Sequence, residues 1–225
     1  MTRKSYQYEL DELRGAVVEL GNAVLQQLKD GLTAFEDGDE QLAQSVIDGD
    51  NGINDRYLKL EADCIDLFAL QQPVASDLRF VASSFKILTD LERIGDLASN
   101  FGGYALAEGH DDGLSVDVSH IGRDASDMVE EAIVAYETED LDLCYQVADW
   151  DDEVDTLCHH ASEQIVRDLI EREHSVDDSW AVERLLDDVS RLLLTIRDIE
   201  RVGDHAVNIA ARTLYMIEQD SDLIY

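Results

Sequence analysis

The sequence predicts an all-α protein of two tandem, pseudo-symmetric three-helix bundles. Apolar residues recur at helical spacing along most of its 225 residues. The chain contains one proline, Pro73, and only 7% aromatic residues, and runs of strand-forming residues are scarce. A twelve-residue motif that begins at Asp90 returns at Asp198. Such self-similarity over half a chain indicates a duplicated unit.

The first half is expected to form three helices. The first runs over about residues 6–35 and ends near Gly38, because glycine readily adopts the left-handed conformation of a helix C-cap. The second runs over about residues 40–71. Pro73 marks the turn into the third, which reaches about Ala107, because proline fits the first turn of a helix and little else in it.

A polar, glycine-containing segment at residues 108–113 is the expected linker, which divides the chain into bundles at residues 1–110 and 111–225. The second half is expected to form helices over about residues 116–137, 140–171 and 179–219. In both halves the apolar stripes of the third helix are interpreted as core. The stripes comprise Val81, Phe85, Leu88, Leu91, Ala98, Phe101, Val189, Leu192, Ile196, Ile199, Ala206 and Ile209.

The two copies align with a changing offset. Seven of twelve positions are identical between residues 90–101 and 198–209, at an offset of 108. Further upstream the offset is 101, which aligns Asp50 with Asp151. The second copy therefore holds seven extra residues, which we place in the polar stretch at residues 171–178 as a surface loop.

The chain is strongly acidic, with 51 Asp and Glu against 17 Lys and Arg and a net charge of −34. Such a surface repels nucleic acids and anionic membranes, so neither is expected as a partner. A disordered acidic chain is the alternative, but 45% hydrophobic residues in regular periodicity argue against it. The excess of Asp and the near absence of Lys resemble proteins of halophilic organisms, in which salt screens the charge.

The three cysteines, Cys64, Cys144 and Cys158, are odd in number and irregularly spaced. Reduced thiols in a cytoplasmic protein are the simple interpretation. The first residues lack the apolar stretch of a signal peptide, and no apolar run approaches the length of a membrane span. We therefore expect a cytoplasmic protein that meets a membrane only through a partner.

Paired carboxylates are the candidate metal ligands. Glu92 and Asp96 lie four residues apart on one helix face, and Glu200 and Asp204 repeat the pair. With 51 acids, chance alone gives about 11 such pairs, most of them on solvated faces. The informative feature is that both copies hold the pair at the same place.

The second helix of each copy carries a matching carboxylate. Asp50, one turn before Asn54, interrupts an apolar seam, and Asp151 does so one turn before Asp155. A carboxylate on an apolar seam is costly unless it is paired or bound to a metal. Oxygens from two neighbouring helices would suit Mg²⁺, Ca²⁺, Mn²⁺ or oxidised iron. The alternative is an acid ladder that contacts only solvent cations.

Three further features accompany the acids. Gly95 and Gly203 lie inside the motif helices at a cost of about 1 kcal/mol each, which a close helix approach or room for a ligand would offset. Asn100 and Asn208 extend the acidic rows by one turn. Arg93 and Arg201 are expected to pair with Asp90 and Asp198, three residues earlier, and anion binding by these arginines is the less favoured alternative.

Other chemistry is weakly supported. Cys158, His159 and His160 are adjacent and point in different helical directions. A single Glu-x-x-His pattern, from Glu171 to His174, is half of what a di-iron carboxylate enzyme needs. Nucleophilic triads, phosphate-binding glycine loops and zinc spacings are absent from the sequence. We therefore predict no catalytic residues and no enzyme.

The motifs at residues 90–96 and 199–204 resemble the duplicated hallmark of the PhoU family, and residues 71–79 resemble the junction between its second and third helices. The resemblance spans nearly the whole chain. It implies two three-helix bundles, often in homodimers, with multinuclear clusters of iron, zinc, manganese, magnesium or another metal ion. It implies ligands at Glu92, Asp96, Glu200 and Asp204, with Asp50, Asp151 and Asp155 on the facing helices. We include Asn54, one turn after Asp50, among the candidate metal ligands.

The resemblance also implies a negative regulator of phosphate uptake. Such a regulator acts through the ATPase subunit of the phosphate ABC transporter and, in bacteria, through a membrane sensor kinase. Asn54 departs from the pattern, because the second copy has Asp155 in its place, and a weaker first site is expected. Two rival hypotheses remain: a carboxylate-bound metal store or metallo-enzyme, and a structural bundle whose acids serve only salt tolerance.

Overall fold

The structure is a computed structural model that describes residues 3–70, 74–107, 118–173, 179–220 and 222–223. It is all-α, and the described residues contain six long helices and no strand. The helices are α1 (Arg3–Asp37), α2 (Glu40–Leu70), α3 (Ala75–Leu106), α4 (Ser119–Thr138), α5 (Leu141–Glu173) and α6 (Ser179–Glu218).

The predicted helices agree with these bounds to within a few residues. Gly38 has a φ of 65°, which confirms the left-handed cap after α1. Glu139, the aligned residue of the second copy, has a φ of 57° without being glycine. The expected turn at Pro73 and the expected linker at residues 108–113 lie outside the described residues.

The extra residues of the second copy are not confined to a surface loop. α5 extends to Glu173, two residues beyond the position that aligns with the end of α2. α6 starts at Ser179, four residues before the position that aligns with the start of α3. The prediction of a loop over residues 171–178 is therefore wrong for Glu171–Glu173, which continue α5, and residues 174–178 lie outside the described residues.

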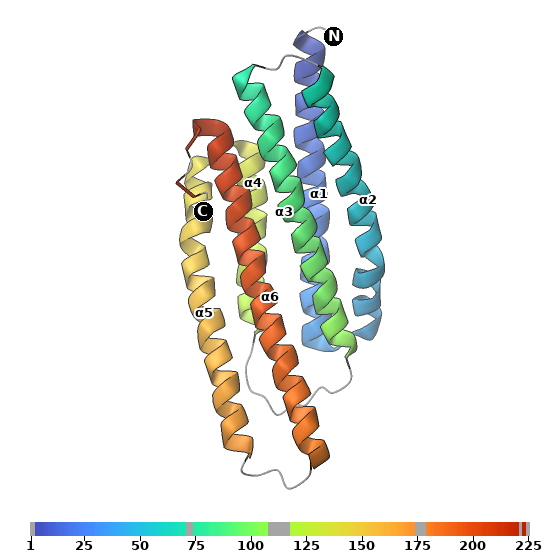
Figure 1. Ribbon diagram of the computed structural model, residues 1–225, viewed down its shortest axis with the longest axis vertical. Helices are drawn as coiled ribbons and strands as arrows, with labels where there is room; N and C mark the ends of the chain where they lie inside the picture. Colours follow the sequence, from blue (N-terminus) through green and yellow to red (C-terminus); the bar gives the residue numbers. More distant parts are fainter. Residues whose placement is uncertain (1–2, 71–73, 108–117, 174–178, 221, 224–225) are drawn as a thin grey trace.

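Figure 1 shows the helices side by side along the long axis of the molecule. α1, α2 and α3 pack on one another in the first half, and α5 packs on α4 and α6 in the second. The halves meet where α1 packs on α4 and α3 packs on α6, and α3 and α6 run in opposite directions.

The α1–α4 contact is reciprocal. A Cβ atom at Gly21 would lie 3.0 Å from the side chain of Ile133, and one at Gly122 would lie 2.9 Å from that of Leu32. In the repeat, Gly21 aligns with Gly122 and Leu32 with Ile133. Each half therefore inserts one aliphatic side chain against the glycine of the other, which follows from packing two copies about a pseudo-twofold axis.

One continuous core joins both halves. Ten of the twelve predicted stripe residues are buried, and Phe85 and Leu192 are partly buried. The Ser84 and Tyr136 hydroxyls lie 2.7 Å apart across the halves. Cys64, Cys144 and Cys158 are free thiols, as predicted, and all three are buried. In the described part of the chain, no helix combines the length and apolarity that crossing a membrane requires.

Candidate metal centre

The predicted ligands fall into two aligned groups. The first cluster comprises Asp50 and Asn54 on α2 with Glu92 and Asp96 on α3. The second cluster comprises Asp151 and Asp155 on α5 with Glu200 and Asp204 on α6. Each cluster therefore spans a pair of packed helices, α2 with α3 and α5 with α6.

The first cluster is partly closed by its own hydrogen bonds. Asn54 Nδ2 donates to Asp50 Oδ2 at 2.9 Å. Arg93 lies 3.5 Å from carboxylate oxygens of both Glu92 and Asp96. Oδ1 of Asp50 is buried without a hydrogen-bond partner. That oxygen is a vacant acceptor beside two more carboxylates.

The second cluster is more open and holds one more carboxylate. Oδ1 of Asp151 is also buried without a hydrogen-bond partner. A Cβ atom at Gly203 would lie 2.7 Å from that oxygen, so the glycine leaves room for this carboxylate. Asp155, Glu200 and Asp204 are exposed at the rim. No ion pair with a described residue involves any of these four acids.

Burial and mutual repulsion disfavour the ionised acids in the first cluster. The pKa of Glu92 is raised by burial and by Asp96, although Arg93 opposes the shift. The pKa of Asp96 is raised by burial and by Asp50, and both Arg93 and Arg201 oppose it. Positive charge from α6, in the other half, therefore reaches the first cluster.

The second cluster has the largest shift. Burial, followed by Asp155 and Asp204, raises the pKa of Asp151 to about 7. Burial and neighbouring acids also raise the pKa values of Asp155 and Glu200. Carboxylates gathered in this way are stabilised in their ionised form by a bound cation.

The donor set fits a hard cation in its chemistry. All donors are carboxylate or amide oxygens, and each cluster holds a buried acceptor without a partner. Among the described residues, however, no group of three or more His, Cys, Asp or Glu side chains is already arranged to hold a metal ion. A cation would therefore draw the side chains together, and in the first cluster it would displace Arg93.

The motif arginines and the motif glycines each behave differently in the two halves. Arg201 lies 3.4 Å from Asp198, as predicted, but Arg93 contacts Glu92 and Asp96, the predicted ligands, rather than Asp90. A Cβ atom at Gly95 would lie 3.4 Å from Cγ2 of Ile53, an ordinary packing distance, so this glycine lies against an aliphatic side chain and makes no room for a ligand. Gly203, in contrast, makes room for a carboxylate.

The asparagines do not extend the acidic rows. Asn100 Nδ2 donates to Asp198 Oδ2 at 3.0 Å, and Asn208 Nδ2 donates to Asp90 Oδ1 at 3.3 Å. Each therefore reaches from its own half to the aspartate that opens the motif of the other half. The repeat could have indicated these reciprocal hydrogen bonds, because an Asp and an Asn lie ten residues apart in both copies.

Two further contacts at this interface were not anticipated from the sequence. The Tyr104 hydroxyl donates to Asp198 Oδ2 at 2.8 Å. Nδ1 of His205 lies 2.9 Å from Asp90 Oδ1. Tyr104 and His205 differ from their aligned residues Arg212 and Leu97, so no pattern common to the two copies revealed them.

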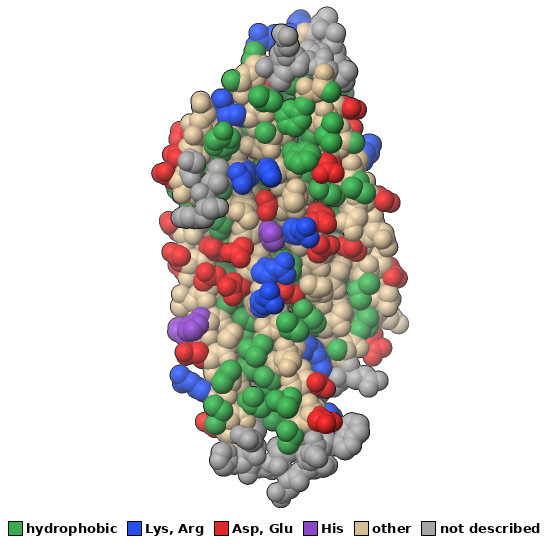
Figure 2. All heavy atoms as spheres, in the orientation of Figure 1, with side chains coloured by type: hydrophobic (Ala, Val, Ile, Leu, Met, Phe, Trp, Pro, Cys, Tyr) green, Lys and Arg blue, Asp and Glu red, His purple; other side chains and the backbone are tan. Residues whose placement is uncertain are grey.

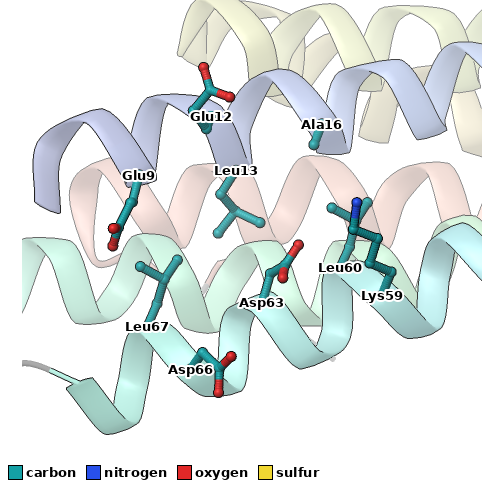
Figure 3. A pocket seen from close by; sticks show the side chains of 9 residues that line it. All are labelled: Glu9, Glu12, Leu13, Ala16, Lys59, Leu60, Asp63, Asp66 and Leu67. Atoms are coloured by element: carbon teal, nitrogen blue, oxygen red, sulfur yellow. The ribbon is translucent and has the colours of Figure 1, made fainter. Parts of the chain in front are cut away.

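The remaining candidate sites gain no support. Cys158 is buried, whereas His159 and His160 are exposed, so the three side chains do not share a site. His174 lies outside the described residues. A groove of about 410 Å³ between α1 and α2 contains none of the predicted ligands. Figure 3 shows Leu13 and Leu67 inside this groove, with Glu9 and Asp63 beside them.

Comparison with known proteins gives a consistent result. The family model described as PhoU domain matches twice, at residues 17–105 and 118–213. A protein of Pseudomonas aeruginosa named phosphate-specific transport system accessory protein PhoU homolog is 35% identical over 217 residues, covering 95% of this chain and 86% of the relative. The Escherichia coli protein named phosphate-specific transport system accessory protein PhoU is 33% identical, covering 93% and 84%.

Solved structures agree with the fold. The crystal structure of PhoU from Pseudomonas aeruginosa superposes with a TM-score of 0.86 at 35% identity, covering 96% of this chain and all of that one. A phosphate transport system regulatory protein PhoU from Streptococcus pneumoniae gives a TM-score of 0.80 at 26% identity, covering 96% and 98%.

Proposed function

This chain belongs to the PhoU family, and from that premise we propose that it is a negative regulator of phosphate uptake that acts on the phosphate ABC transporter. Proteins of this family are regulatory accessory proteins rather than enzymes. The observation that carries the proposal is the match of both halves to the PhoU domain, together with relatives named as accessory proteins of phosphate transport.

The proposed partner is the ATPase subunit of the transporter, and the proposed assembly is a homodimer in the cytoplasm. A sensor kinase is a further proposed partner. Two packed bundles with one continuous core offer a rigid surface for such a partner. The acidic surface repels the negatively charged face of a membrane, which favours recruitment through a protein.

Metal ions are the proposed cofactors. Asp50, Glu92 and Asp96 would hold a cation in the first cluster, with Asn54 as a weaker ligand. Asp151, Asp155, Glu200 and Asp204 would hold one in the second. A bound cation would neutralise acids whose mutual repulsion now costs free energy, and it would link α2 to α3 and α5 to α6.

Co-purification from phosphate-rich cells tests the regulator. The tagged full chain, purified from its own cells at their native salt concentration, is expected to bring the transporter ATPase with it. Asp127→Asn, an exposed change on α4 outside both clusters, serves as the matched control and should behave as wild type. Failure to recover the ATPase with wild type, in repeated experiments with transporter present, would contradict the proposed partner.

A further inference from the structure

Three arginines gather at the α3–α6 interface of a protein that has few cations. Arg93 on α3 and Arg197 and Arg201 on α6 form what we name the arginine seam. The chain has 17 Lys and Arg against 51 Asp and Glu, so three arginines where two packed helices meet stand out. Figure 2 shows basic side chains and a histidine down the centre of the face formed by α3 and α6, with acids on both sides.

The spacing lets the three side chains act together. Arg197 and Arg201 lie four residues apart, so their Cβ atoms are about 6 Å apart on one face of α6. Both act on Tyr104: burial and the bond to Asp198 raise its pKa to about 12, and the two arginines oppose that shift. Arg201 contacts Asp198, which also accepts a hydrogen bond from Asn100 of α3. Asn100 lies one turn beyond Asp96, the partner of Arg93, so Arg201 reaches across the helix interface toward the segment that carries Arg93.

The guanidinium groups retain free donors. Arg201 contacts Asp198 through one nitrogen at 3.4 Å, and Arg93 makes two contacts of 3.5 Å. None of these is the short, two-pronged geometry of a strong arginine–carboxylate pair. Arg197 makes no ion pair within 4.0 Å in the described part of the chain, and it is exposed. Each guanidinium has five donors, so most remain open to a ligand.

Charge compensation explains only part of the seam. Arg93 and Arg201 contact carboxylates and balance them directly. Arg197 acts only through space on Glu200, whose pKa is raised by burial, Asp155 and Asp204. Arg197 could compensate the charge of Glu200 without sharing a helix face with Arg201. A ligand that accepts hydrogen bonds from both arginines requires that they share that face.

We propose that Arg93, Arg197 and Arg201 bind a small divalent oxyanion, inorganic phosphate, between the two acidic clusters. The planar fork of a guanidinium matches the oxygens of a tetrahedral oxyanion, and donors from two helices surround one. The choice of phosphate rests on the proposed function, whereas the seam itself does not. Salt at 0.15 M screens the charges that lie more than about 8 Å away, so most of the net charge of −34 opposes binding only weakly. The nearby carboxylates of Glu92, Asp96 and Asp198 do oppose a dianion, and Arg93 and Arg201 partly neutralise them.

Calorimetric titration of the full chain with inorganic phosphate tests the seam. The protein is first dialysed against a chelator, so that phosphate cannot bind to a metal ion in the acidic clusters. Circular dichroism confirms that the metal-free protein remains helical. Wild type is expected to bind one phosphate per chain. Arg197→Gln and Arg201→Gln should each weaken binding at least tenfold. Arg197 is exposed, so its removal leaves the core intact.

Arg56→Gln is the matched control, because Arg56 is an exposed arginine on α2 away from the seam. It should bind phosphate as wild type does, and sulfate should compete whereas nitrate should not. Absence of saturable binding by folded wild type would overturn the proposal, as would equal weakening by Arg56→Gln or equal competition by nitrate. Such a failure leaves the recovery of the transporter ATPase unaffected, so it is distinct from failure of the proposed function.

Discussion

A Cβ atom placed on Gly203 of α6 would lie 2.7 Å from Oδ1 of Asp151 on α5. The aligned glycine of the first half, Gly95, faces an aliphatic carbon of Ile53 at 3.4 Å instead. The motif glycine therefore makes room for a carboxylate in the second half, whereas in the first half an added Cβ would meet a methyl group at an ordinary packing distance. In the second half, backbone packing and the proposed metal ligand depend on each other.

Gly203→Ala is expected to weaken metal binding at the second cluster about tenfold, because the new methyl group displaces the Asp151 carboxylate. The free energy of unfolding should change by less than about 1 kcal/mol, since alanine favours the helix by a similar amount. Mn²⁺ titration and urea unfolding measure the two effects. Gly15→Ala is the control, because no atom lies within 4 Å of its added Cβ, and it should leave Mn²⁺ binding unchanged. Unchanged Mn²⁺ affinity in Gly203→Ala would refute the steric argument.

Asp151→Asn should stabilise the metal-free protein at pH 8 by about 1–2 kcal/mol, after allowance for solvent screening. Asp151 is charged there, although burial and Asp155 disfavour that charge. Urea unfolding after chelation measures the gain, and the exposed Asp149→Asn should show none. Loss of stability in Asp151→Asn would mean that the carboxylate has a structural partner.

The pH dependence of stability follows from the same acid. The folded pKa of Asp151 is about 7 against an ordinary value of 3.8, so the folded state keeps its proton longer than the unfolded state. This group therefore lowers the stability of the folded state as the pH rises from about 4 to about 7. The stability difference between Asp151→Asn and metal-free wild type should grow over that window. A difference independent of pH would contradict the assigned cause.

Tyr104→Phe is expected to cost about 1 kcal/mol of unfolding free energy, because the hydroxyl bridges the halves to the buried Asp198. Asp198→Ala should cost about 3 kcal/mol, since Asn100 and Tyr104 both lose their acceptor. Urea unfolding measures both. Tyr8→Phe, at an exposed tyrosine, is the control and should be neutral. Equal effects of the two tyrosine changes would show that the interface bond contributes nothing.

Gly31→Ala should destabilise the first half by about 1–3 kcal/mol, because its Cβ would lie 2.7 Å from the backbone oxygen of Ala98. A backbone carbonyl cannot rotate away as a side chain can. Thermal unfolding, compared with Gly15→Ala, measures the loss. A neutral Gly31→Ala would show that α1 and α3 can separate without cost.

The repeat predicted six helices and aligned Asp50 with Asp151, because residue spacing determines which positions share a helix face. It did not predict at which residue a row of side chains four residues apart leaves the acidic face of the helix. Successive positions four residues apart rotate by about 40° around a helix, so Asn100 is turned by about 80° from Glu92. That rotation carries Asn100 away from Asp50 and toward Asp198 on α6.

Residue spacing alone could not predict the conformation of the inserted residues or the ion-pair partners of Arg93. An offset counts extra residues but does not say whether they are helical, and Glu171–Glu173 prolong α5. Arg93 has acids within reach on either side, at Asp90, Glu92 and Asp96. Its choice of Glu92 and Asp96 follows from His205 and Asn208, which occupy Asp90 from the other half. No sequence period encodes that competition.

Elemental analysis of protein purified without chelator tests the central claim, that two aligned acidic clusters bind metal. Wild type should retain metal, Asp50→Asn should lose the share of the first cluster, and Asp151→Asn should lose the larger share of the second. The double variant should retain none, whereas Asp127→Asn should match wild type. Equal metal content in the double variant and wild type, both folded, would contradict the account.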